Sequence, residues 1–269
     1  MRWFAKIDLM VRLLVLAILL ASFLPAAGNA REIAQWISHG AIFVLFFLNG
    51  LRLPRDEVLQ GMRHWRFLIP VLIWCFGAMA LAGKGLAIGL VGSLPPLVAL
   101  GFLYLGVMPS TVQSATAYSS LAGGKVSSSI VAAALTNIAG VFICAPMFAA
   151  LAGSGAVEMG VDGLTKVFAI LILPFAIGQL LQGRLSHWVR ERKDLITWMD
   201  RISIAIAVYV AFSGAVEQGL WTMIGISEWA ILLAATCVML AFAFIGAWTV
   251  GGQLRLDRGD RIAFLFAGA

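Results

Sequence analysis

The chain has 269 residues, of which 61% are hydrophobic and 12% are charged, and its mean hydropathy is +0.97. An ordinary soluble domain carries about 45–50% apolar and about 25% charged residues, so this much apolar surface cannot be buried in one soluble core. The same figures exclude a disordered chain, a collagen-like chain and a disulfide scaffold. The formal net charge of +6 is expected to reflect membrane topology rather than binding to nucleic acid. We therefore expect an all-α integral membrane protein with several spans.

Eight segments are apolar and long enough to be predicted as spanning helices, which need about 20 residues each. They are residues 9–27, 33–51, 67–83, 94–122, 126–152, 164–183, 199–219 and 227–250. A ninth apolar segment begins at Ile262, and the sequence given ends at Ala269. These residues reach only about 12 Å along a helix, against a hydrocarbon core of about 30 Å. We interpret them as a partial ninth span, as expected of a truncated gene product or a fragment.

The first segment allows two interpretations. Arg2, Lys6 and Arg12 lie at the start of an apolar run that ends at Phe23, and residues 25–30 after it resemble a signal-peptidase site. A retained first helix is favoured because the repeat plan described below needs it. A cleaved signal peptide is the alternative.

The distribution of positive charge predicts the orientation of the chain. With the N-terminus in the cytoplasm, 16 of the 19 Lys and Arg residues fall on the cytoplasmic side, and only Arg31, Lys84 and Lys166 fall outside. An excess of Lys and Arg in cytoplasmic loops is the usual pattern in membrane proteins. We expect a multi-pass membrane protein with a cytoplasmic N-terminus.

The richest polar cluster runs from Met108 to Ser129, within and after the fourth predicted span. Pro109 removes a backbone donor and clashes with the preceding turn, which predicts an interrupted helix. Unwound backbone at bilayer depth persists only where it is buried in protein or lines a cavity. Its oxygens, together with those of the side chains at residues 110–116, suit a hard cation such as Na⁺. The alternative is a simple proline kink whose hydroxyls bond neighbouring helices.

Further polar residues are candidates for lining a substrate cavity. They are Asn49, Tyr118, Asn137 and Gln179. Asn137 lies on one helix face with Ser129, so an interhelical hydrogen bond and a role in the cavity both remain open for it. No acidic residue lies deep within a predicted span, the three histidines do not cluster, and no catalytic motif is found. We expect no enzyme and no metal site other than one for sodium.

Four motifs support a family assignment when they are taken together. They are FFLNGLRL at 46–53, PSTVQSATAYSSLAGG at 109–124, TNIAG at 136–140 and LPFAIGQ at 173–179. With these motifs the chain resembles the bile acid:sodium symporter superfamily, and in particular its bacterial SBF-like branch.

The resemblance implies two inverted five-helix repeats with discontinuous crossing helices, near whose crossing sodium binds. Residues 1–152 would form the first repeat and residues 164–269 an incomplete second repeat, with eight full spans and a partial ninth present. The implied sodium ligands, with nearby Gln113 added, are Gln113, Ser114, Thr116 and Ser129. Ala115 and Thr116 stand where the family shows a serine and an asparagine, and Ala133 and Phe266 where it shows a threonine and an acidic ligand. The missing amide and carboxylate put a two-sodium stoichiometry in doubt.

The resemblance also implies a function. It is sodium-coupled symport of an organic, anionic or amphipathic solute by alternating access, with Na⁺ as the coupling ion and no other cofactor. The partners would be the solute, sodium and the lipid bilayer. The absence of the last helices from the sequence leaves two alternatives: an uncoupled carrier, or a non-transporting membrane protein such as a receptor or an assembly partner.

Overall fold

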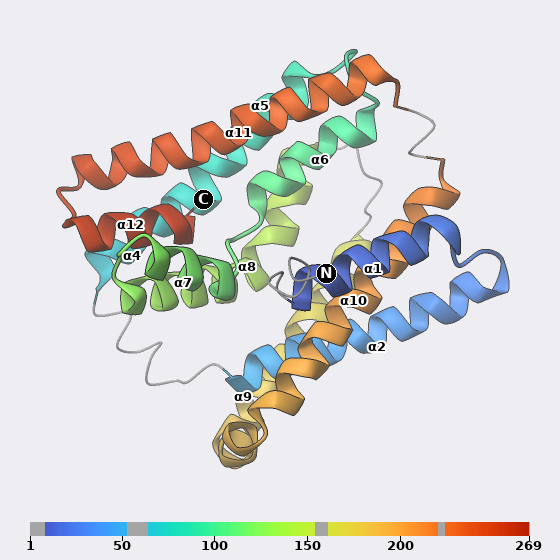
Figure 1. Cartoon of the computed structure of the whole chain (residues 1–269), viewed down its shortest axis with the longest axis horizontal. Coiled ribbons are helices and arrows are strands. Elements are labelled where there is room, and N and C mark those ends of the chain that lie inside the picture. The colour runs from blue at the N-terminus through green and yellow to red at the C-terminus, as the bar shows by residue number, and fades with distance from the viewer. Residues whose placement is uncertain (1–8, 53–63, 154–160, 220–223, 269) are drawn as a thin grey trace, which may run out of the picture. The chain divides into compact units, whose positions relative to one another are not determined.

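The computed structural model describes residues 9–52, 64–153, 161–219 and 224–268, without the side chains of Gln113, Ser186, Arg190 and residues 161–169. The described residues form helices joined by short connections (Figure 1). The chain divides into two compact units, one of residues 1–53 and 166–223 and the other of residues 54–165 and 224–269. Each unit combines segments from both halves of the chain. The units therefore differ from the predicted repeats 1–152 and 164–269, and the repeats remain a prediction.

The described residues of unit 1 form four helices, of which the first two pack along the last. They are α1 (Leu9–Phe23), α2 (Asn29–Arg52), α9 (Val161–Glu191) and α10 (Lys193–Glu217). The Tyr209 hydroxyl donates a hydrogen bond of 2.8 Å to the Leu24 carbonyl, and Arg31 forms an ion pair of 2.7 Å with Glu217. Helix α1 packs on α10 in this unit, and the choice between a retained helix and a cleaved signal peptide remains a prediction.

Helices α2 and α9 approach closely where two glycines face each other. A Cβ atom on Gly50 would collide with the Phe175 carbonyl oxygen, and one on Gly178 would collide with the Phe47 carbonyl oxygen. Small residues allow such close approach of helix backbones in membranes, where packing replaces the hydrophobic effect as the driving force. The two glycines therefore fix where α2 and α9 touch.

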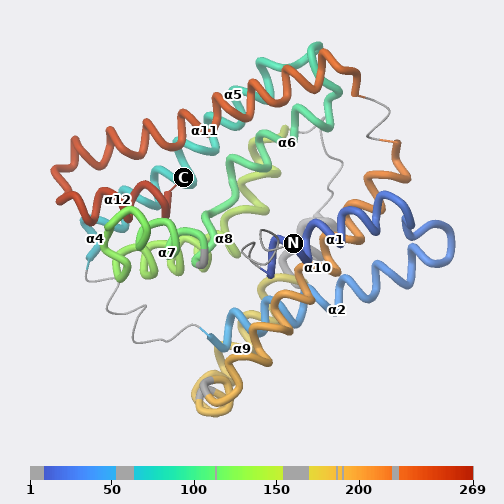
Figure 2. Tube along the Cα trace, in the orientation of Figure 1, coloured from blue at the N-terminus to red at the C-terminus, as the bar shows by residue number. Residues whose placement is uncertain are grey.

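Unit 2 contains the other elements that the described residues form. They are α4 (Trp65–Ile73), the π-helical turn η2 (Trp74–Ala78), α5 (Met79–Gly89), α6 (Pro96–Val107), α7 (Val112–Leu121), α8 (Val126–Ala152), α11 (Ile226–Gln253) and α12 (Arg258–Gly268). The Cα trace shows the short helix α12 returning beside α7 (Figure 2), and α12 also packs on α8 and α11. The buried core of this unit combines large side chains, such as Phe67 and Phe264, with many alanines. The alanines let the helices pack closely.

Five helices, counted over the described residues, are long and apolar enough to cross a membrane. They are Asn29–Arg52, Trp65–Gly89, Val126–Ala152, Lys193–Glu217 and Ile226–Gln253. The other three predicted spans correspond to shorter apolar helices, Leu9–Phe23, Pro96–Val107 and Ile170–Leu185. The all-α membrane class is therefore supported, whereas the number of eight full spans remains a prediction.

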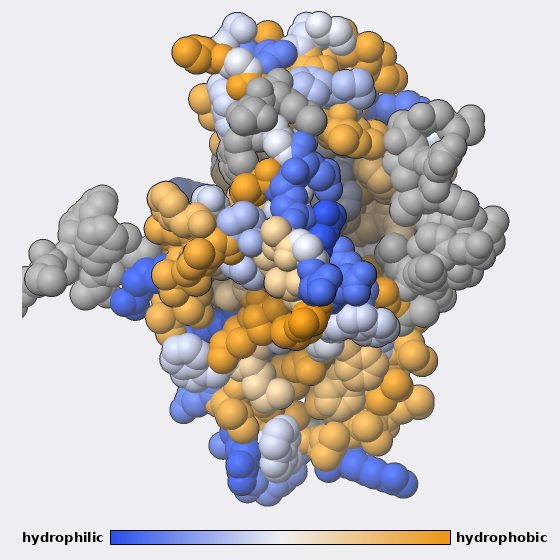
Figure 3. Space-filling view, turned by 90° about the vertical axis from the view of Figure 1, so that its right-hand side faces the viewer, coloured by the Kyte–Doolittle hydropathy of each residue, from blue (hydrophilic) through white to orange (hydrophobic). Residues whose placement is uncertain are grey.

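The outer surface agrees with a lipid environment. Hydrophobic residues cover much of the face seen in Figure 3. On α11, Leu233, Val238 and Ile245 are each between 58% and 64% exposed. Apolar side chains exposed in this number would be unfavourable in water and favourable in contact with acyl chains.

Candidate functional site

The interruption predicted at Pro109 is present in unit 2. Helix α6 ends at Val107 and α7 begins at Val112, so Met108, Pro109, Ser110 and Thr111 lie outside both helices. Met108 and Thr111 have extended backbone conformations, with φ/ψ of −84°/133° and −77°/140°. The Met108 N–H still bonds the Leu105 carbonyl and the Thr111 carbonyl still accepts from the Ala115 N–H, but groups between them, such as the Ser110 carbonyl, have left the helical ladder and need other partners.

One face of helix α8 supplies a partner for the Ser110 carbonyl and also bonds the last residue of α6. The Asn137 Nδ2 atom donates a hydrogen bond of 2.7 Å to the Ser110 carbonyl, and the Cys144 Sγ atom donates one of 3.0 Å to the Val107 carbonyl. Between them, a Cβ atom on Gly140 would lie 2.9 Å from the Pro109 ring, so glycine makes room for the proline. We call Asn137, Gly140 and Cys144 the α8 cradle. Their spacing of three and four residues places them on one helix face.

Helix α12 contacts the same interruption. The Ser110 hydroxyl donates a hydrogen bond of 2.9 Å to the Phe266 carbonyl near the end of α12. The rings of Tyr118 and Phe266 lie 5.7 Å apart between their centroids. The interruption therefore has contacts with both α8 and α12, with Met108, Pro109 and Ser110 half-buried and Thr111 exposed.

The predicted sodium ligands occupy different positions around α7. Ser114 is half-buried and its hydroxyl bonds the carbonyl of Thr111 at 3.2 Å. The Thr116 hydroxyl donates to the Val112 carbonyl at 2.6 Å. Ser129, on α8, is fully buried and accepts a hydrogen bond of 3.0 Å from Ser119. The side chain of Gln113 lies outside the part that the structure describes.

The helical spacing decides which of these hydroxyls can share one ion. Ser114 and Thr116 are two residues apart and so point to nearly opposite sides of α7, whereas Thr116 and Ser119 are three residues apart and share a face. Ser119 in turn bonds Ser129. We call the hydroxyls of Thr116, Ser119 and Ser129 the oxygen set; Ser114 lies on a different side of α7, and the role of each predicted ligand in binding sodium remains a prediction.

Apolar side chains surround this oxygen set. Ala115 and Ala133 are buried and belong to one apolar cluster with Ala263, Phe264 and Ala267 of α12. The described residues hold no group of three or more His, Cys, Asp or Glu side chains able to bind a metal ion. A hydroxyl that donates its proton still keeps two lone pairs. The three hydroxyls are thus neutral oxygens of the kind that suits a hard cation, and a charged group, the Asp260 carboxylate, bonds Ser128 beside Ser129.

The candidate cavity residues are divided between the two units. Tyr118, which is 55% exposed, and Asn137 belong to unit 2. Asn49, which is exposed, and Gln179 belong to unit 1, where the Gln179 Nε2 atom donates a hydrogen bond of 2.7 Å to the Gly50 carbonyl. Asn137 donates to the carbonyls of both Ser110 and Ala133 at 2.7 Å. These bonds agree with the interhelical alternative for Asn137, and the role of all four residues in a cavity remains a prediction.

Three features of the structure had no counterpart in the sequence analysis. Ser119 is fully buried, and its position four residues after buried Ala115 could have placed it on the inner face of α7. Cys144 lies on the same face of α8 as Asn137, but a cysteine within an apolar segment does not by itself predict a hydrogen bond to another helix. Asp200, at the edge of the seventh predicted span, is buried and forms an ion pair of 3.0 Å with Arg52 in unit 1.

The comparisons with known proteins agree with the geometry. The model of the SBF-like CPA transporter family matches residues 8–269. The chain is 35% identical over 260 residues to the uncharacterized protein PA2026 of Pseudomonas aeruginosa, covering 95% of this chain and 77% of that protein.

Two further relatives carry functional names. The chain is 32% identical over 273 residues to the putative symporter YfeH of Escherichia coli, covering 100% of this chain and 81% of that protein. It is 22% identical over 267 residues to sodium/bile acid cotransporter 7 of Mus musculus, covering 94% and 76%. These matches confirm the resemblance seen in the motifs. The chain belongs to the SBF-like CPA transporter family, within the bile acid:sodium symporter superfamily.

Proposed function

We propose that this membrane transporter is a sodium-coupled symporter of an organic, anionic or amphipathic solute and works by alternating access. The observation that carries the proposal is the interruption between α6 and α7, with the buried Ser119–Ser129 hydroxyl pair on the adjoining face of α7. Discontinuous helices expose backbone and hydroxyl oxygens where transporters bind their coupling ions. The names of the relatives, a putative symporter and a sodium/bile acid cotransporter, support the same function. The protein would lie in the inner membrane with a cytoplasmic N-terminus.

In this proposal one sodium ion binds between α7 and α8. Thr116 and Ser129 would be its side-chain ligands, because neutral oxygens suit a hard monovalent cation. Ala115 and Ala133 lack the hydroxyl oxygens of the serine and threonine that the family shows at these positions, which favours the binding of a single ion. One charge crossing about 100 mV provides about 2.3 kcal/mol, equivalent to roughly fifty-fold accumulation of the solute. A single ion is therefore sufficient to drive uptake.

Sodium-driven uptake in proteoliposomes tests the proposal. The probe is radiolabelled taurocholate, and an inward sodium gradient is compared with an equal choline gradient. The proposal predicts uptake that depends on sodium and that falls in Thr116→Ala and Ser129→Ala. Thr236→Ala is the matched control, because this exposed threonine on α11 makes the same bond to the carbonyl four residues earlier, at 2.8 Å. Uptake that is equal in sodium and in choline would refute coupling.

An uncoupled carrier is the second candidate, and one observation favours it. Ala115 and Ala133, which occupy positions where the family shows oxygen ligands, are packed in an apolar cluster. For this function, taurocholate would equilibrate across the vesicle membrane at the same rate with and without sodium. Exchange of labelled for unlabelled taurocholate, measured without any ion gradient, separates a carrier of this kind from a protein that does not transport.

A further inference from the structure

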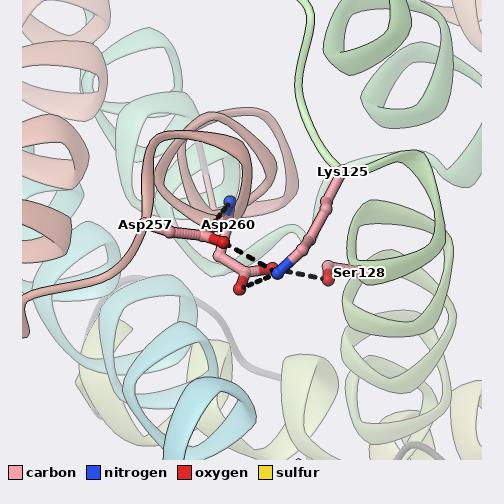
Figure 4. A network of polar contacts seen from close by, with 4 residues as sticks. All are labelled: Lys125, Ser128, Asp257 and Asp260. Carbon is pink, nitrogen blue, oxygen red and sulfur yellow. Dashed lines mark hydrogen bonds and ion pairs between the residues drawn. The ribbon is translucent and has the colours of Figure 1, made fainter.

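A network of charged residues joins two connections of unit 2 that are far apart in the sequence. The Lys125 Nζ atom lies 2.9 Å from Asp257 Oδ2 and 2.8 Å from Asp260 Oδ2. The Ser128 hydroxyl donates a hydrogen bond of 2.7 Å to Asp260 Oδ1 (Figure 4). Lys125 precedes α8, and the two aspartates lie at the start of α12. We call these four residues the clasp.

The backbone reinforces the clasp. The Lys125 N–H donates a hydrogen bond of 3.0 Å to the Gly259 carbonyl. The Asp260 N–H donates one of 2.7 Å to Asp257 Oδ1, which caps the first turn of α12. A Cβ atom on Gly124 would lie 2.5 Å from the Ile262 side chain, so the two connections already touch. The clasp therefore fixes α12 at a defined place on the turn between α7 and α8.

The charges of the clasp depend on one another. Hydrogen bonds to Asp260 and Asp257 raise the pKa of Lys125, and the bond from Lys125 lowers the pKa of Asp257. Without the ammonium group, two carboxylates would face each other at the start of α12 with no cation between them. Exposed ion pairs contribute little to stability, and Lys125 and Asp257 are half-exposed. We therefore expect the clasp to act on the position of α12 more than on the stability of the fold.

The clasp lies at one end of α12 and the interruption at the other. From Asp260 to Phe266 the helix rises about 9 Å, and the Phe266 carbonyl accepts the hydrogen bond from Ser110. On α8, Ser128 of the clasp is followed directly by Ser129, whose hydroxyl pairs with Ser119. The clasp is therefore connected through α12 to the interruption and through α8 to Ser129 of the oxygen set.

We propose that the clasp of Lys125, Ser128, Asp257 and Asp260 positions α12 and the first turn of α8 and thereby sets the sodium affinity of the transporter. The proposal rests on the proposed sodium coupling, and it makes these four residues positioning residues that never touch the ion. Partners that orient metal ligands directly typically change affinity by about 10–100-fold when mutated. The clasp does not contact the proposed ligands directly, so we expect its loss to lower the sodium affinity by a smaller factor of about 3- to 10-fold.

Two measurements on the purified full chain test this. The first is hydrogen–deuterium exchange of the α12 amides without sodium. The second is the sodium concentration that gives half of the maximal rise in thermal unfolding midpoint, at constant ionic strength made up with choline. Lys125→Met and Asp260→Asn should speed exchange in α12 and raise the half-saturating sodium concentration about 3- to 10-fold. The maximal rise should not change, because the ligands remain.

Two matched variants control for general damage. Arg31→Met removes an ion pair of similar length in unit 1, and Ser127→Ala removes an exposed serine next to Ser128. Both variants should show wild-type exchange in α12 and a wild-type half-saturating sodium concentration. Ser128→Ala should change both quantities in the same direction as Asp260→Asn, but by less.

The possible outcomes separate the clasp from the sodium coupling. Unchanged exchange in α12, or faster exchange with an unchanged half-saturating sodium concentration, would overturn the clasp. A wild-type midpoint that does not respond to sodium would instead refute the proposed function and, with it, the link from the clasp to an ion. In that case the exchange measurement would still show whether the clasp orders α12.

Discussion

Replacing Asn137 with alanine is expected to destabilise the protein even without sodium or solute. The side chain donates to the carbonyls of Ser110 and Ala133, each at 2.7 Å. Ala133 lies within α8, so its carbonyl keeps a backbone partner, whereas Ser110 lies in the interruption. Leaving a buried carbonyl unpaired costs about 1–3 kcal/mol, and interhelical hydrogen bonds in membranes measure about 0.6 and at most about 1.7 kcal/mol. We expect a loss of about 1–2 kcal/mol.

The loss can be measured as a shift in the thermal unfolding midpoint. For a chain of this size 1 kcal/mol corresponds to about 2–4 °C, so the midpoint should fall by about 2–8 °C. Cys144→Ala should lower it less, because a thiol is a weak donor. Asn137→Asp, which keeps the size but loses the donor, should be at least as harmful as Asn137→Ala. An unchanged midpoint in both Asn137 variants, with a raised KM for the solute, would refute the α8 cradle and support the cavity role instead.

Three further predictions follow from other parts of the structure. Gly50→Ala should destabilise unit 1, because the new Cβ would meet the backbone of α9, whereas Gly40→Ala in the same helix meets open space; unfolding midpoints compare the two. Asp200→Asn should leave Arg52 without its charge partner. The free energy of unfolding, measured by denaturant titration, should fall by about 1–3 kcal/mol, less than when a fully buried ion pair is broken. The clasp distance, measured by electron paramagnetic resonance between labels on the first turns of α8 and α12, should stay constant near neutral pH. It should lengthen only well below about pH 3.9, where Asp257 with its lowered pKa takes up a proton, or well above about pH 10.4, where Lys125 with its raised pKa loses one. A lengthening between pH 5 and pH 9 would contradict this assignment of the charges.

The sequence was sufficient to predict where the helices lie, because hydropathy and length alone decide which segments suit a bilayer. It also predicted the interruption at Pro109. Pro70, Pro146 and Pro174, in contrast, lie inside continuous helices. Proline alone therefore does not decide where a membrane helix is interrupted. At Pro109, Asn137 of the cradle bonds the Ser110 carbonyl and Ser114 bonds the Thr111 carbonyl.

Contacts between distant parts of the chain could not be predicted in the same way. The clasp joins residues that are 132 and 135 positions apart, and the Arg52–Asp200 pair spans 148 positions. Hydropathy and helical period describe one segment at a time, so they do not reveal which segments pack together. For the same reason the division into two compact units, each built from both halves of the chain, was not foreseen.

Sodium-dependent stabilisation is the most direct test of the proposed ion site, because it needs no knowledge of the solute. A ligand that binds only the folded state stabilises it by about 1.4 kcal/mol at ten times its Kd, or about 3–6 °C for a chain of this size. We predict that the wild-type unfolding midpoint is higher in sodium chloride than in choline chloride at equal ionic strength. The difference should disappear in Ser129→Ala and Thr116→Ala and persist in Thr236→Ala. Equal midpoints in the two salts for the wild type would contradict a sodium site beside the interrupted helix.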